Sequence, residues 1–291
     1  MVGNMMKRFY PFVTAAKLLA CFLVYQYVFV TVGQLVAFIC YRQFAEPVAY
    51  SVFTASPTAA MTAYAVEGMA VGMFLSSAAM IAHLLYFKYV CIRKGFLCEV
   101  RSGVLLLSAL FIFCMMVVFN IAAAWLGLEN TTQQEVELLL KSGAGVVSMA
   151  FLAPILEELL FRGAIQGMLM RYFKNPWIGI LLASLLFGII HLNPVQMFYA
   201  TCLGVGFGWI YYRTGSLLPA MSGHILNNSL AVVNGLIWGV DSDADALVGA
   251  DGGLSVVMFF SLAMLLLAYL INIRLPKVPV PWREVGECCE K

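Results

Sequence analysis

The chain has 291 residues, of which 63% are hydrophobic and only 11% charged, with a mean hydropathy of +0.91. Ordinary soluble domains contain about 45–50% apolar and about 25% charged residues, so a water-soluble fold of this size is excluded and the bilayer must form part of the solvent. The net charge of +2 provides no strong attraction to polyanions, so we expect no nucleic-acid partner.

Eight apolar segments are long enough, or nearly long enough, to cross a membrane. A spanning helix needs about 20 mostly apolar residues, because each residue rises about 1.5 Å and the hydrocarbon layer is about 30 Å thick. In chain order, the segments lie near residues 11–41, 65–90, 103–126, 143–172, 176–192, 194–212, 216–239 and 253–273. The fifth and sixth are short and are joined only by the turn signal Asn193-Pro194. The first lacks a clear small-residue cleavage site, so we expect a retained helix rather than a signal peptide.

The charges between these segments alternate in character. The basic set includes Lys88 and Arg101 before the third segment, whereas the next connection carries Glu129, Glu135 and Glu137. Basic loops stay in the cytoplasm, and an odd number of spans would break this alternation. The sequence therefore predicts an all-α polytopic membrane helical bundle of about eight transmembrane helices. We expect residues 1–291 to form a single membrane domain with both termini cytoplasmic.

The fourth segment carries two adjacent glutamates. An ionisable group at membrane depth costs at least about 2.5–3.5 kcal/mol on insertion scales, so it needs a partner or a function. Glu158 and Arg162 are four residues apart and can pair on one helix face, whereas Glu157 points about 100° away. Pro154 should weaken the helical hydrogen bonds nearby and open space there.

The fifth segment ends with Phe187 and His191, which are four apart and should share one face. The fourth and fifth segments form a hairpin that turns near residues 174–176. Glu157 precedes this turn by about as many residues as His191 follows it, so the two side chains should lie at similar depth. An acid and an imidazole at one level of adjacent helices can share a water molecule.

The seventh segment contains His224 and Asn228, again four apart, while Asn227 should point away from them. An imidazole N–H beside a carboxamide N–H suits an oxyanion, the charge that develops when a peptide carbonyl is attacked.

Glu-Glu-x-x-x-Arg, Phe-x-x-x-His and His-x-x-x-Asn, in this order on successive predicted helices, resemble the motifs of the CPBP family. This family contains the CAAX prenyl endopeptidases and the bacterial abortive-infection (Abi) membrane proteases. The resemblance covers about residues 143–239, which we expect to be the catalytic core.

What the resemblance implies is an intramembrane endopeptidase. Glu157 would activate a water molecule with the help of His191, and His224 and Asn228 would bind the oxyanion. Glu158 and Arg162 would support the site, and Phe187 would shape the substrate pocket. The substrate and partner would be a membrane-associated peptide or protein, and the lipid bilayer its medium. We expect the chain to reside in a bacterial inner membrane.

The family has been described both as zinc-dependent and as glutamate-dependent, so a second chemistry stays open. The chain has no His-Glu-x-x-His motif, but Glu157, His191 and His224 could still supply three zinc ligands. We favour no metal and no cofactor, because His224 beside Asn228 is more typical of a donor pair. A transporter and a non-catalytic immunity or scaffold protein are the alternatives from other classes.

Overall fold

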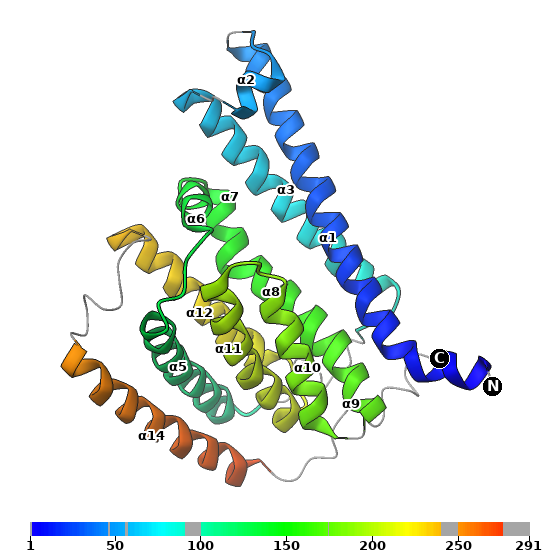
Figure 1. Ribbon diagram of the computed structural model, residues 1–291, viewed down its shortest axis with the longest axis vertical. Helices are drawn as coiled ribbons and strands as arrows, with labels where there is room; N and C mark the ends of the chain where they lie inside the picture. The colour runs from blue at the N-terminus through cyan, green and yellow to red at the C-terminus, as the bar shows by residue number, and fades with distance from the viewer. Residues whose placement is uncertain are drawn as a thin grey trace.

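The computed structural model describes residues 2–45, 47–55, 58–90, 100–173, 175–239 and 250–275, with the side chains of residues 10–45, 47–55, 58–90, 100–173, 175–239 and 253–275 (Figure 1). The described residues form helices and short connections, without a strand. The helices are α1 Val2–Phe44, α2 Tyr50–Ala55, α3 Ala59–Tyr86, α5 Ser102–Trp125, α6 Gln133–Leu140, α7 Gly143–Val147, η1 Ser148–Leu152, α8 Ala153–Glu157, η2 Glu158–Gln166, α9 Gly167–Phe173, α10 Pro176–Ile189, α11 Pro194–Thr214, α12 Leu218–Trp238 and α14 Ala250–Arg274.

Five stretches of helix are long and apolar enough to cross a membrane. They are Tyr10–Phe44, Ala59–Tyr86, Ser102–Trp125, Gly143–Phe173 and Gly253–Arg274, and each coincides with a predicted segment. The other three predicted segments are also helical, as α10, α11 and α12, but α10 has only 14 residues and so rises about 21 Å. The all-α membrane bundle is confirmed, and the chain is a multi-pass integral membrane protein. The count of eight spans and the cytoplasmic termini stay predictions.

Helices α1 and α3 lie side by side as a long hairpin at one edge of the molecule (Figure 1). Glycines on both helices allow their backbones to touch. A Cβ atom on Gly68 would lie 2.5 Å from the carbonyl oxygen of Gly33, and one on Gly72 would lie 2.6 Å from that of Phe29. Small residues at a helix interface are a usual way to gain close packing in a bilayer, where lipid competes for apolar contacts.

Two apolar clusters fill the rest of the bundle. One joins α1, α3, α10 and the long helix Gly143–Phe173, with Leu160, Phe161, Ile180 and Phe187 among its buried members. The other joins α5, α11, α12 and α14 around Ile112 and Phe207. Glycines on α11 also allow close packing, because a Cβ on Gly204 or Gly208 would press against neighbouring side chains.

The helix Gly143–Phe173 is interrupted by two π-helical segments, η1 and η2. Between them lies α8, with Pro154 as one of its first residues. The N–H of Ala153 donates to the carbonyl oxygen of Ser148, five residues back, and Pro154 has no N–H to donate. The predicted weakening of the regular ladder around Pro154 is therefore confirmed.

Helix α10 ends three residues earlier than predicted, at Ile189, so His191 lies in a turn and not in a helix. Leu192 adopts a left-handed conformation with φ of 52°, and Asn193 is extended and caps α11 by accepting from the N–H groups of Val195 and Gln196. The physical reason is Pro194, because in a continued helix its ring would clash with the carbonyl of Ile190 and it also disfavours the helical conformation in Asn193.

The glycine contact between α1 and α3 makes a direct prediction about stability. Gly68→Ala should lower the thermal unfolding midpoint in detergent, because the new methyl group meets the backbone of Gly33, which cannot rotate away. Overpacking of this kind costs about 1–3 kcal/mol. Gly103→Ala is the matched control, since a Cβ there meets nothing within 4 Å. Equal midpoints for the two variants would contradict the close approach.

Candidate active site

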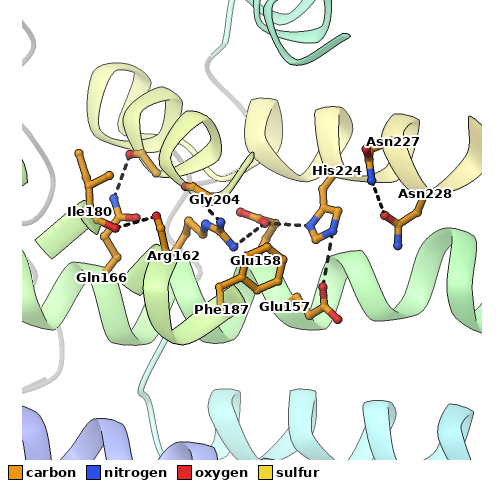
Figure 2. A network of polar contacts seen from close by, with 12 residues as sticks. Glu157, Glu158, Arg162, Gln166, Ile180, Phe187, Gly204, His224, Asn227 and Asn228 are labelled. Atoms are coloured by element: carbon orange, nitrogen blue, oxygen red, sulfur yellow. Dashed lines mark hydrogen bonds and ion pairs between the residues drawn. The ribbon is translucent and has the colours of Figure 1, made fainter. Parts of the chain in front are cut away.

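Glu157, the last residue of α8, faces His224 of α12 (Figure 2). Its Oε2 lies 3.5 Å from Nε2 of His224, and its side chain is 15% exposed. The two residues are 67 positions apart in the chain. The structure therefore brings together an acid and an imidazole that the sequence had assigned to different steps.

Glu158, the next residue, is fully buried and has a different environment. Its Oε1 forms an ion pair with Nη1 of Arg162 at 2.9 Å and accepts a hydrogen bond from Nδ1 of His224 at 2.9 Å. The predicted pair of Glu158 and Arg162 is confirmed, while the bond to His224 was not foreseen. Since the two glutamates approach opposite nitrogens of one imidazole, the ring is held between them.

Arg162 lies between two aromatic rings. Its Cζ atom is 4.4 Å from the ring centroid of Phe187 and 5.2 Å from that of Phe207, distances at which a guanidinium is attracted to a ring face. Its Nη2 donates to the carbonyl oxygen of Gly204 at 3.2 Å. The side chain is 1% exposed, so its charge depends on these partners and on Glu158.

Gln166 extends the same row of polar side chains, and the sequence analysis missed it. Its Nε2 donates to the carbonyl oxygen of Gly208 at 2.9 Å, four residues after the glycine that Arg162 contacts. The spacing of Glu158, Arg162 and Gln166 by fours was the available signal. Two polar side chains on η2, Arg162 and Gln166, thus donate hydrogen bonds to two glycine carbonyls on α11.

The side chain of His191 is oriented by a contact with the backbone at the end of α10. Its Nδ1 lies 2.8 Å from the carbonyl oxygen of Phe187, which can only accept, so Nδ1 carries a proton, and in the neutral form of the ring Nε2 keeps a lone pair. The rings of His191 and His224 both lie edge-on to Phe187, with centroids at 5.1 Å and 5.6 Å. No hydrogen bond or ion pair joins His191 to Glu157 within the described residues.

Asn228 lies one helical turn after His224, on the same side of α12 (Figure 2). Its Nδ2 donates to the carbonyl oxygen of Met149 at 3.0 Å, and its Oδ1 accepts from Nδ2 of Asn227 at 2.9 Å. The expectation from helical periodicity did not foresee this contact, in which the Asn227 amide reaches the side chain of its neighbour. Asn227 in turn accepts from the hydroxyl of Tyr199 at 2.6 Å.

The three ligands of the alternative zinc chemistry, Glu157, His191 and His224, do not come together as a set. Glu157 and Nε2 of His224 lie close enough to bind one ion, and the bond from Nδ1 of His224 to Glu158 is compatible with a ligand role for Nε2. Over the described residues, no three His, Cys, Asp or Glu side chains form a metal-binding group, so His191 does not complete the set. We therefore derive no catalytic step through a metal.

Residues 140–230 match a family model described as type II CAAX prenyl endopeptidase Rce1-like. This match confirms the expected resemblance to the CPBP family. The chain is also 29% identical over 105 residues to a protein of Bacillus subtilis (strain 168) named "Putative membrane peptidase YdiL". These residues are 36% of this chain and 43% of that protein, so the chain spans less than half of the relative's length. No solved structure matches the chain.

Because Arg162 is buried beside Glu158, we expect a variant that removes both charges to be more stable than one that removes Arg162 alone. Arg162→Met should lower the free energy of unfolding by about 3–5 kcal/mol, because Glu158 keeps its buried charge but loses the guanidinium that pairs with it. The double variant Glu158→Gln, Arg162→Met should recover part of this loss, since both charges are then removed. Denaturant titration in detergent measures both values, and a double variant less stable than the single one would contradict the ion-pair interpretation.

Proposed function

We propose that this protein is an intramembrane endopeptidase in which Glu157 activates a water molecule. The observation that carries the proposal is the contact between Glu157 and His224, with the amide of Asn228 beside them on α12. It is supported by the Rce1-like match, which spans every residue of the site. A carboxylate that is partly accessible to water, next to two donors, is the arrangement that carbonyl hydrolysis requires.

The proton positions of His224 follow from its partners. Since the Glu158 carboxylate accepts, Nδ1 of His224 carries a proton. A second proton on Nε2 would face the carboxylate of Glu157 and would bring the net charge of Glu157, Glu158, Arg162 and His224 to zero. We infer that His224 is this imidazolium, because a buried group of charges is most stable when it is balanced.

In the proposed reaction, Glu157 takes a proton from water as the water oxygen attacks the scissile carbonyl carbon. The negative charge that forms on the carbonyl oxygen is bound by Nε2–H of His224 and by the second N–H of Asn228 Nδ2. Glu157 then gives its proton to the departing amine as the C–N bond breaks. His191, whose Nε2 lone pair is free to accept a hydrogen bond, would orient the water.

The proposed substrate is a peptide bond of a membrane-associated protein or peptide, because the site lies within a membrane-spanning bundle. No cofactor is needed for this chemistry, since the base and both donors are side chains of the chain itself. The proposed location is a bacterial inner membrane. A zinc-dependent peptidase, a transporter and a non-catalytic immunity or scaffold protein are the alternatives that the experiments must exclude.

Glu157→Gln should abolish turnover and leave the fold intact, because the amide cannot accept the proton of water. Purified wild type and variant in detergent would be treated with a strong chelator and mixed with a quenched-fluorescent peptide library. Cleavage by chelated wild type alone supports the glutamate mechanism. Activity that is lost on chelation and restored by zinc would replace it with the metal-dependent one.

Retained cleavage by Glu157→Gln would refute the assignment of the base. Cleavage by neither protein, over a broad library, would count against a peptidase and in favour of the scaffold or transporter. A matched control is Glu67→Gln, which changes a glutamate on α3 that accepts from Ser142 and lies outside the proposed site.

Asn228→Asp tests the oxyanion donor with almost no change of shape. The carboxylate cannot donate to the developing charge and also faces the carbonyl of Met149, so we expect kcat to fall about 10²–10³-fold. KM should change little, because the donor acts mainly in the transition state. A fall in kcat/KM that comes entirely from KM would assign Asn228 to substrate binding instead.

A further inference from the structure

A chain of hydrogen bonds runs from α11 through α12 to the long helix that carries Glu157. The Tyr199 hydroxyl donates to Oδ1 of Asn227 at 2.6 Å, and Nδ2 of Asn227 donates to Oδ1 of Asn228 at 2.9 Å. Nδ2 of Asn228 then donates to the carbonyl oxygen of Met149 at 3.0 Å. Neither Tyr199 nor Asn227 belongs to the motifs that carry the family resemblance.

The donor-to-acceptor direction of this series of hydrogen bonds is fixed at its Met149 end. A backbone carbonyl can only accept, so the atom of Asn228 that faces Met149 must be the amide nitrogen. Its oxygen therefore faces Asn227 and needs a donor there, which sets the amide of Asn227 with its own oxygen towards Tyr199. The phenol completes the series by donating. Reversing any one amide would bring two acceptors or two donors together.

The carbonyl of Met149 needs a side-chain donor because of Pro154. In a regular helix this carbonyl would accept from Ala153, but the N–H of Ala153 donates to Ser148 instead. In the π-helical pattern it would accept from Pro154, which has no N–H. The proline thus frees a carbonyl, and Asn228 binds to it from another helix.

We propose that Tyr199 and Asn227 are positioning residues, which hold the Asn228 amide so that its second N–H is available to the oxyanion. This inference rests on the proposed function. One N–H of Asn228 is used by Met149 and its oxygen by Asn227, so among the described residues a single donor of this amide remains free. Without the phenol hydroxyl, the oxygen of Asn227 loses its donor and its amide can reverse, so that Oδ1 of Asn228 loses its donor and the Asn228 amide keeps its contact with Met149 but is held less firmly.

The test is a kinetic double-mutant cycle with Tyr199→Phe and Asn228→Ala in the full-length protein, assayed on a peptide that the wild type cleaves. Tyr199→Phe should lower kcat on the order of 10- to 100-fold at unchanged KM, as loss of a partner that orients a reacting group does. In the Asn228→Ala background the same change should have no further effect, because its target is gone. Asn227→Leu, which removes the central amide at similar volume, should behave in the same way.

Tyr211→Phe is the matched control, since it removes another tyrosine hydroxyl from α11 about three turns further along the helix, and it should leave kcat unchanged. A purely structural role for Tyr199 would lower kcat by the same factor in both backgrounds. That result, or an equal loss in Tyr211→Phe, would overturn the proposal.

A second readout separates this proposal from the proposed function. In protein labelled with ¹⁵N-asparagine, the side-chain amide signal that disappears in Asn228→Ala belongs to Asn228, and Tyr199→Phe should shift it. This measurement can be made even if the wild type cleaves no peptide. The proposed peptidase function would then fail, but the NMR signal would still decide whether Tyr199 positions the amide of Asn228. An unshifted signal in Tyr199→Phe would overturn the positioning role whatever the activity.

Discussion

The site depends on one buried carboxylate oxygen. Oε1 of Glu158 binds both Arg162 and His224 at 2.9 Å, in a part of the bundle from which water is excluded. Removing a charge from water costs several kcal/mol, so this oxygen holds its two partners strongly. Arg162 and His224 also share ring contacts with Phe187 and Phe207, which belong to the two separate apolar clusters. The cluster of Glu158, Arg162 and His224 is therefore the point at which the two apolar clusters meet.

The irregular backbone of the long helix Gly143–Phe173 also holds a side chain of the site, on the side where Asn228 lies. Because η1 and Pro154 interrupt the regular hydrogen bonds, a backbone carbonyl becomes available to α12 at the position where Asn228 can reach it. In a bilayer such a carbonyl cannot be left to water, so it must find a donor within the protein. An interruption in one helix thus determines where a side chain of another helix is held.

Much of this arrangement could be predicted from spacing by fours. The pair of Glu158 and Arg162 and the common face of His224 and Asn228 follow from helical periodicity. Contacts between helices could not be predicted in this way. The bond from Glu158 to His224 depends on how η2 and α12 pack, and the end of α10 depends on Pro194, whose effect on the preceding residues outweighed the apolar pattern. The reach of the Asn227 side chain is also invisible to a rule that places only Cβ atoms.

The two adjacent glutamates have different environments. This difference explains how the His224 ring can be held through one nitrogen while its other nitrogen remains accessible. Glu158 is fully buried and shares its oxygen with Arg162, so its contact with Nδ1 of His224 is structural. Glu157 is 15% exposed, and its contact with Nε2 is longer, at 3.5 Å. A longer and more accessible contact can be replaced by water or substrate at smaller cost than a buried one. In the proposed reaction, the asymmetry of the two contacts would leave Nε2 as the nitrogen that turns towards the substrate oxygen while Nδ1 stays bound to Glu158.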